Sequence, residues 1–256
     1  MRPEPATIVL TGASGGLGRA LAEIYAVPGA VLHLLGRNED RLAATAAAVR
    51  DRGAAAKTHA VEVRDREAMA QVIAAIAAEG AIDLVIANAG ISAGSAGGPE
   101  GPEQTRAVFE TNLTGMLNTV EPALAAMRER GAGQIALVSS MAGFRGMPGA
   151  PAYCGSKAAV RVWGEAVRGE MAALGIRISV ICPGYVATPM TAINAYPMPF
   201  LVPAERAARI IKAGLARNRG RIVFPWPMKI AAWLLQALPD PLLDAFARRL
   251  PAKSGL

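Results

Sequence analysis

Three side chains in the middle of the chain, Ser140, Tyr153 and Lys157, have types and spacings that suit proton transfer to a carbonyl oxygen. Tyr153 and Lys157 are four residues apart, so on one helix they would share a face. A phenol titrates near ~10, and a close cation favours the phenolate, so Lys157 is expected to make Tyr153 a usable general acid or base. Ser140 is expected to donate a hydrogen bond to a developing oxyanion. The alternative is an exposed helical pair without chemistry, because short motifs often mislead.

Two elements would hold these side chains. The apolar run 135–138 predicts a buried strand that ends beside Ser140. Pro151 stands where a long helix would begin, a position at which its missing N–H costs little. Tyr153 and Lys157 would then lie near the start of that helix.

A glycine-rich segment near the N-terminus predicts a phosphate site. Residues 6–10 are typical of a buried strand, a helix is predicted over 19–26, and the segment 11–18 joins them. Glycines let the backbone approach a pyrophosphate, and the N-terminus of a helix attracts its charge. The spacing is Gly-x-x-x-Gly-x-Gly and not the Gly-x-Gly-x-x-Gly of the older dinucleotide fingerprint.

The second predicted strand, 30–35, is followed by Arg37 and has no carboxylate at Gly36. In dinucleotide-binding sheets an acidic residue at this point binds the ribose 2′-hydroxyl, whereas an arginine accommodates a 2′-phosphate. Arg37 therefore favours NADP over NAD, and NAD stays a possible cofactor. The alternative is that Arg37 is only a solvated residue before the next helix. His33 lies inside the apolar strand and is interpreted as a core histidine.

Predicted strands and helices alternate along the chain, which is typical of an α/β fold with a parallel sheet and helices on both faces. Further strands are predicted over 57–63, 83–87, 176–181 and 221–224, and further helices over 39–52, 66–79, 103–130 and 203–217. The expectation is one Rossmann-like, doubly wound parallel sheet of about seven strands, in a single domain over 1–256.

Composition bounds the setting of the protein. A chain of 256 residues that is 52% hydrophobic can form a large core. Two cysteines, Cys154 and Cys182, give no disulfide framework, which favours a reducing compartment. Residues 1–5 lack the apolar region of a signal peptide, and no run of 18 or more apolar residues occurs. A cytoplasmic protein without a metal site is expected.

The net charge of +7 raises nucleic acid and anionic membrane as partners. The 27 basic residues are scattered, however, and no basic run is interleaved with aromatic residues. The interpretation is a solvated, arginine-rich surface, with no nucleic-acid partner.

The C-terminal segment 225–256 is expected to form an apolar helical extension. The run 225–239 is apolar nearly all round, so it must be buried or meet a membrane surface, and it is too short to span a bilayer. A cap on the core, a dimer contact or a lid beside the pocket is favoured over a membrane-surface helix. Either arrangement suits a lipophilic ketone or alcohol as substrate. The run that follows includes Leu242, Leu243, Phe246, Arg248, Arg249 and Leu250.

Over roughly residues 7–224 the chain resembles the short-chain dehydrogenase/reductase family. The residues that carry the resemblance are Thr11-Gly12 with Gly16-Leu17-Gly18, Asn88-Ala89-Gly90, Asn112-Leu113-Thr114-Gly115, Ser140 thirteen residues before Tyr153, Tyr153 with Lys157, and Pro183-Gly184 with Thr188. The resemblance implies an NAD(P)-dependent oxidoreductase that assembles as a homodimer or homotetramer.

The resemblance also implies roles for individual residues. Tyr153 would exchange a proton with substrate, and Ser140 would orient the substrate oxygen. Lys157 would bind the nicotinamide ribose and lower the pKa of the tyrosine, and Asn112 would hold a water that links Lys157 to solvent. The cofactor would be bound by Gly12, Ser14, Gly15, Gly16, Leu17, Gly18, Arg37, Glu62, Val63, Asn88, Ala89, Gly90, Tyr153, Lys157, Pro183, Gly184, Val186 and Thr188. The substrate would contact Ser140, Met141, Tyr153 and Tyr185.

Two positions depart from the family pattern. Glu62 stands where the family usually has an aspartate against the adenine. Gly15 stands where relatives that prefer NADP often have a basic residue, so the preference for NADP depends on Arg37 alone.

The predicted function is hydride transfer between NADP(H) and a carbonyl or secondary alcohol. Eight residues are expected around the substrate or, alternatively, in ordinary core packing: Met141, Phe144, Met147, Tyr185, Met190, Tyr196, Met198 and Phe200. The alternative functions are a non-catalytic nucleotide sensor on the same fold and a membrane-associated binding protein that uses the apolar tail.

Overall fold

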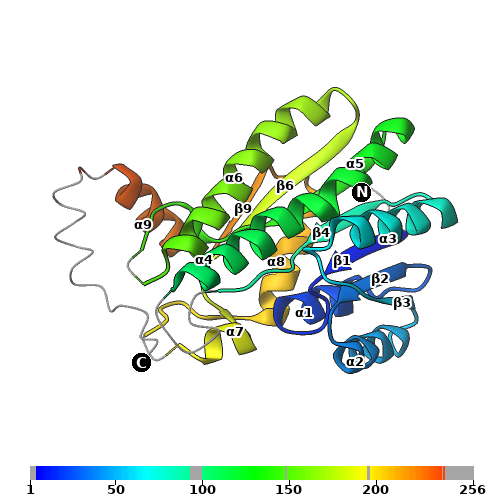
Figure 1. The fold of residues 1–256 in the computed structure, drawn as a ribbon, viewed down its shortest axis with the longest axis horizontal. Coiled ribbons are helices and arrows are strands. Elements are labelled where there is room, and N and C mark those ends of the chain that lie inside the picture. Colours follow the sequence, from blue (N-terminus) through cyan, green and yellow to red (C-terminus); the bar gives the residue numbers. More distant parts are fainter. Residues whose placement is uncertain (1–3, 93–99, 148, 195–196, 238, 240–256) are drawn as a thin grey trace.

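The computed structural model describes residues 4–92, 100–147, 149–194, 197–237 and 239. Within these ranges seven parallel strands form one sheet in the order β3-β2-β1-β4-β5-β6-β9 (Figure 1). The strands are β1 (Thr7–Thr11), β2 (Val31–Gly36), β3 (Ala55–Ala60), β4 (Leu84–Ala87), β5 (Gly133–Val138), β6 (Ile176–Pro183) and β9 (Arg221–Phe224). This confirms the predicted Rossmann-like, doubly wound sheet.

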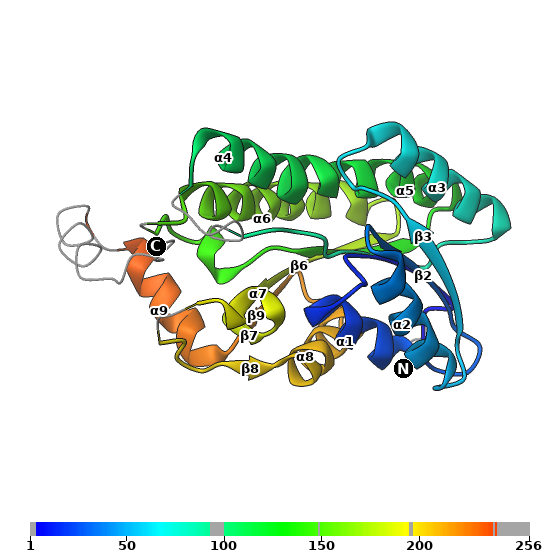
Figure 2. The ribbon, with the colours of Figure 1, turned by 60° about the horizontal axis from the view of Figure 1, so that its bottom comes forward.

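Helices cover both faces of the sheet. Figure 2 shows α3, α4, α5 and α6 along one side and α1, α2 and α8 along the other. The helices are α1 (Gly16–Tyr25), α2 (Glu39–Arg50), α3 (Arg66–Glu79), α4 (Pro102–Phe109), α5 (Gly115–Arg130), α6 (Pro151–Ala172), α7 (Pro189–Ala192), α8 (Ala204–Ala216) and α9 (Trp226–Ala237).

Each face of the sheet has its own apolar core, because successive side chains on a strand point to opposite faces. In β1, Ile8 and Leu10 join the core under α1, α2 and α8, whereas Val9 joins the core under α3, α5 and α6. Both faces are buried, which is why the central strands are apolar throughout and not alternating. Because all seven strands are parallel, their carboxyl ends lie at the same edge of the sheet.

The helix predicted over 103–130 is interrupted, which corrects that expectation. A π-helical turn, Glu110–Thr114, separates α4 from α5 and contains Asn112. Asn112 is drawn inward by hydrogen bonds to the backbone of Ile91, and Gly115 fits tightly against Val63. Hydrogen bonds to a distant loop thus override the local helical pattern, and such π turns often mark functional sites.

Two boundaries bear on the site. The strand predicted over 57–63 is β3, which ends at Ala60, so Glu62 and Val63 lie in the loop beyond it. The helix predicted from 19 begins at Gly16, so the last glycines of the turn belong to its first turn. His33 is buried in β2 as predicted, and its Nδ1 lies 3.0 Å from Nε2 of His59.

A short second sheet and helix α9 lie beyond β6. The parallel pair of β7 (Val186–Ala187) and β8 (Val202–Pro203) brackets α7. The predicted apolar helix forms as α9, and Trp226, Ile230 and Leu234 expose about half or more of their surface. The remaining residues of the predicted extension, 238 and 240–256, lie outside the described residues. In the part of the chain that the structure describes, no helix is long and apolar enough to cross a membrane.

Candidate active site

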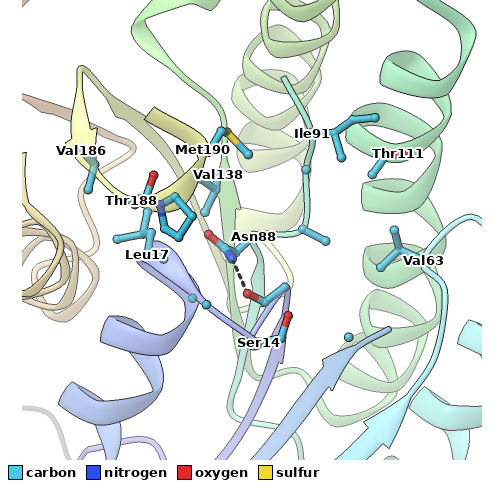
Figure 3. Close-up of a pocket in the computed structure, with 18 of the residues that line it drawn as sticks. Ser14, Leu17, Val63, Asn88, Ile91, Thr111, Val138, Val186, Thr188 and Met190 are labelled. Carbon is cyan, nitrogen blue, oxygen red and sulfur yellow. Dashed lines mark hydrogen bonds between the residues drawn. The ribbon is translucent and has the colours of Figure 1, made fainter. Parts of the chain in front are cut away.

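A cleft of about 360 Å³ opens at the carboxyl ends of the central strands, where open α/β sheets bind their ligands. Every residue that the sequence assigned to the cofactor lines it, together with others: Gly12, Ser14, Gly15, Gly16, Leu17, Gly18, Gly36, Arg37, Arg41, Val61, Glu62, Val63, Asn88, Ala89, Gly90, Ile91, Thr111, Val138, Ser139, Tyr153, Lys157, Pro183, Gly184, Val186, Thr188, Pro189, Met190 and Thr191. Figure 3 shows Leu17 and Thr188 on one side of the cleft and Val63 and Thr111 on the other.

The glycine turn between β1 and α1 has the form of a phosphate cradle. Gly12 has a φ of +64° and Gly16 of +55°, a region that favours glycine. A Cβ on Gly18 would lie 2.0 Å from the carbonyl oxygen of Gly12, so strand and helix approach too closely for any side chain there. Among the described residues no side chain caps α1, and its first turn contains no acidic residue. Its N-terminal N–H groups and dipole suit an anion.

Asn88, the residue after β4, binds the backbone of this turn. Its Nδ2 donates to the carbonyl oxygens of Thr11 at 3.1 Å and Gly12 at 3.2 Å. In return, the Thr11 hydroxyl accepts hydrogen bonds from the N–H groups of Asn88 and Ala89. The amide of Asn88 lies in the middle of the cleft in Figure 3, where it stiffens the turn.

Tyr153 and Lys157 face the cleft that the glycine turn lines. The Nζ of Lys157 lies 5.9 Å from the centroid of the Tyr153 ring and donates a 2.9 Å hydrogen bond to the carbonyl oxygen of Val138, at the end of β5. Ser139 donates from its hydroxyl to the carbonyl oxygen of Lys157 at 2.7 Å. Two hydrogen bonds therefore connect the end of β5 to the first turns of α6.

The pKa of Tyr153 departs from the sequence-based expectation. Burial raises the pKa of the phenol, and a hydrogen bond with Ser140 only partly offsets that rise. Burial also lowers the pKa of Lys157 to about 8. The expectation that the pKa of Tyr153 lies below its usual value is thus wrong for this arrangement, because the desolvation of the phenolate outweighs the other influences. The contribution of Lys157 to that pKa stays a prediction.

Asn112 is buried and links three segments. Its Oδ1 accepts from the N–H of Ile91 at 2.8 Å, and its Nδ2 donates to the carbonyl oxygen of Ile91 at 2.9 Å and to the hydroxyl of Ser156 at 3.0 Å. Asn112 is not among the described residues that line the cleft. It holds the segment after β4 against α6, and its role in binding a water stays a prediction.

The end of the cleft beyond β2 and β3 carries an ionic network. Arg37, whose side chain is 67% exposed, lies 3.3 Å from a carboxylate oxygen of Glu62, and Arg64 lies at the same distance from that oxygen. Glu62 therefore pairs with arginines at the place where the resemblance assigns it to adenine. Arg41, in the first turn of α2, also lines the cleft and was missed. Its position four residues after Arg37 was the signal that could have identified it.

The expected substrate residues are dispersed. Ser140, Met141 and Tyr185 are not among the described residues that line the cleft, whereas Met190 is. Phe144 packs between Arg161 and Arg221, whose guanidinium carbons lie 4.9 and 5.5 Å from the ring centroid, so it is a packing residue.

Several other apolar residues lie on the surface or outside the lining. Met147 and Phe200 are exposed, Met198 is partly buried next to Asn194, and Tyr196 lies outside the described residues. The lining residues that the sequence reasoning missed are Gly36, Arg41, Val61, Ile91, Thr111, Val138, Ser139, Pro189 and Thr191. Most of them follow a strand or adjoin a motif, which was the available signal.

A doubly wound parallel sheet, a glycine turn at its carboxyl edge and a tyrosine–lysine pair in the same cleft define a dinucleotide-binding oxidoreductase. The chain belongs to the short-chain dehydrogenase family, whose family model matches residues 6–196.

Known relatives agree with this assignment. The chain is 37% identical to an uncharacterized oxidoreductase of Myxococcus xanthus over 246 residues. This match covers 95% of this chain and 97% of the relative. A short-chain dehydrogenase from Mycobacterium paratuberculosis, solved with NAD, superposes with a TM-score of 0.74 at 26% identity over 85% of this chain and 94% of its own. An actinorhodin polyketide ketoreductase solved with NADPH superposes with a TM-score of 0.76 at 26% identity, over 88% of this chain and 97% of its own.

Proposed function

We propose that the protein transfers a hydride between NADP(H) and a carbonyl or secondary alcohol, with Tyr153 as the general acid or base. The single observation that carries this proposal is that Tyr153 and Lys157 face the same cleft as the glycine turn. A non-catalytic nucleotide sensor would have no need of a phenol and an ammonium that face the same cleft, with a serine hydroxyl hydrogen bonded to the phenol.

The residues of the cleft fit a nicotinamide dinucleotide. The uncapped N-terminus of α1 and the close approach of Gly12 and Gly18 suit the pyrophosphate. Gly90 leaves room beside Lys157, because a Cβ there would lie 3.3 Å from Nζ. When bound, the cofactor would supply or accept the hydride. Lys157 would hold the nicotinamide ribose, and Thr188 would lie at the carboxamide or phosphate side.

The protein's own task would be proton transfer. Because the pKa of Tyr153 is raised, the phenol keeps its proton at neutral pH and can donate it to a carbonyl oxygen during reduction. Ser140, which hydrogen bonds with the phenol, would orient the same oxygen. With a pKa of about 8, Lys157 is mostly an ammonium at pH 7 and would stabilise the phenolate that remains.

NADP is proposed over NAD because two cations, Arg37 and Arg41, line the end of the cleft beyond β2. An arginine at this point suits a 2′-phosphate. Glu62 holds Arg37 at 3.3 Å, so a 2′-phosphate would compete with that carboxylate for the guanidinium. NAD remains the alternative cofactor.

A lipophilic substrate is proposed from the apolar side chains in α7 and in the segment that follows it. Met190 lines the cleft, and Ile193, Phe200 and Leu201 nearby along the chain are exposed apolar residues. The polyketide ketoreductase among the structural neighbours supports a ketone as the reacting group. Substrate-side roles for Ser140, Met141 and Tyr185 stay part of this proposal.

A cytoplasmic homodimer or homotetramer is proposed as the working form, as the family resemblance implies. The exposed apolar side chains of Trp226, Ile230 and Leu234 on α9 give the chain a surface that a second copy would cover. Light scattering of the purified protein tests the assembly.

The test of the reaction is steady-state NADPH oxidation with a panel of ketones that differ in the length of an apolar chain. We expect turnover that improves with chain length and is weaker with NADH. NADPH binding without turnover on any ketone, and without NADP reduction by the matching alcohols, would favour the sensor instead.

A further inference from the structure

The helix that carries Tyr153 begins without a side-chain cap of its own. Its N-cap residue is Ala150, and its first turn contains no acidic residue. Helix N-termini leave unsatisfied N–H groups and carry a partial positive charge, so they favour an oxygen acceptor and a negative charge. A residue from another part of the chain supplies both.

That residue is Glu100, which lies just before α4. Its Oε2 accepts a 2.7 Å hydrogen bond from the N–H of Ala152, and its Oε1 accepts a 3.4 Å hydrogen bond from the N–H of Tyr153. Glu100 and Ala152 are 52 positions apart, so this is a tertiary cap and not a local one. One carboxylate therefore binds the backbone of the tyrosine and of the residue before it.

The other side of the Tyr153 backbone is bound as well. The carbonyl oxygen of Tyr153 accepts a 2.9 Å hydrogen bond from the hydroxyl of Ser156. That hydroxyl accepts a 3.0 Å hydrogen bond from Nδ2 of the buried Asn112. Glu100 on the N–H side and the Ser156–Asn112 pair on the carbonyl side thus fix the tyrosine between them.

We propose that Glu100 is a positioning residue for Tyr153, which it holds at the angle that proton transfer requires. This proposal rests on the proposed function, since it assigns Glu100 a part in that reaction. Rates of positioned proton transfer fall steeply with small displacements, because the reacting atoms must be held within a narrow geometry. Glu100 acts through the backbone of α6 and does not itself line the cleft among the described residues.

Three variants test the proposal. Glu100→Ala removes the acceptor. Glu100→Gln keeps a carbonyl oxygen for the N–H of Ala152 but removes the charge. Glu103→Ala is the matched control, because Glu103 is an exposed carboxylate three residues further on with no hydrogen bond or ion pair among the described residues.

We expect Glu100→Ala to lower kcat for ketone reduction by about 10- to 100-fold, a size typical of a small misplacement, while the Kd for NADPH stays within about twofold of the wild type. Glu100→Gln should recover most of the lost kcat, and Glu103→Ala should match the wild type. A full kcat in Glu100→Ala would overturn the proposal. So would a loss of NADPH binding in parallel with kcat, because that pattern indicates a general structural role.

Amide hydrogen exchange separates this proposal from the proposed function. The amides of Ala152 and Tyr153 should exchange faster in Glu100→Ala than in the wild type, whether or not a ketone substrate is turned over. Unchanged exchange would overturn the role of Glu100. If Glu100→Ala shows faster exchange but the wild type reduces no ketone, the proposed reaction is refuted while the contact between Glu100 and the two amides is confirmed.

Discussion

The Nζ of Lys157 lies 5.9 Å from the centroid of the Tyr153 ring, one helical turn along α6, and both side chains face the cleft that the glycine turn lines. The lysine donates to the carbonyl oxygen of Val138, so its position is set by the end of β5 as well as by α6. This arrangement places a phenol that retains its proton beside a buried cation.

Replacement of Tyr153 by Phe should abolish proton transfer and leave the cofactor site intact. A positioned general acid typically contributes about 10²- to 10⁴-fold, so we expect kcat to fall by that amount. The Kd for NADPH, measured by fluorescence titration, should change little because the glycine turn is untouched. Retained turnover would refute the role of the phenol.

Gly90 gives a steric test of the same region. A Cβ at this position would lie 3.0 Å from Oδ1 of Asn112 and 3.3 Å from Nζ of Lys157. Asn112 cannot yield easily because Ile91 binds it on both sides, so we expect Gly90→Ala to displace Lys157 and lower kcat/KM by about 10-fold or more. Gly169→Ala on the surface of α6 is the control, since the space around it is open among the described atoms and alanine favours a helix. Equal kinetics for the two variants would contradict this geometry.

The network of Arg37 and Glu62 predicts how the choice of cofactor can be altered. Arg37→Ala should lower kcat/KM with NADPH by roughly 10-fold or more, the size of a charge-assisted hydrogen bond, and leave NADH nearly unaffected. Glu62→Gln should improve kcat/KM with NADPH, because it removes the carboxylate that competes for Arg37. Arg52→Ala is the control, because Arg52 pairs with Glu23 and is not among the described residues that line the cleft. A parallel change with both cofactors in Arg37→Ala would count against the preference for NADP.

The contact between the buried His33 and the half-buried His59 predicts a loss of stability in acid. Burial and the neighbouring His59 lower the pKa of His33 from 6.5 to about 4, and Lys57 acts in the same direction, while Glu79 opposes it. The unfolded chain then binds a proton more readily than the folded one between these values, so stability falls as pH drops from 6.5 to 4. For His33 alone the loss from pH 8 to pH 5 is about 2 kcal/mol.

Urea denaturation at several pH values measures this loss. His33→Asn should show a shallower decline between pH 6.5 and 4, although its stability at pH 8 will be lower because a buried site is repacked. A decline as steep as that of the wild type would show that other groups cause the acid sensitivity.

The sequence by itself determined the α/β alternation, the glycine turn and the tyrosine–lysine pair. These follow from short-range patterns: apolar runs form buried strands, glycines permit a positive φ, and four-residue spacing aligns two side chains on a helix. The bounds of α3 and β9 were predicted correctly for that reason, and so was the start of α6 at Pro151.

Only the tertiary structure decided which distant groups meet these elements. The π turn at Asn112 depends on the backbone of Ile91, the cap of α6 comes from Glu100, and the carboxylate of Glu62 reaches Arg37 from the next loop along the sheet edge. The pKa of Tyr153 likewise depends on the burial of its phenol in the folded protein. Hydrogen bonds and desolvation between residues dozens of positions apart leave no periodic trace in the sequence, so they emerge only when the chain is folded.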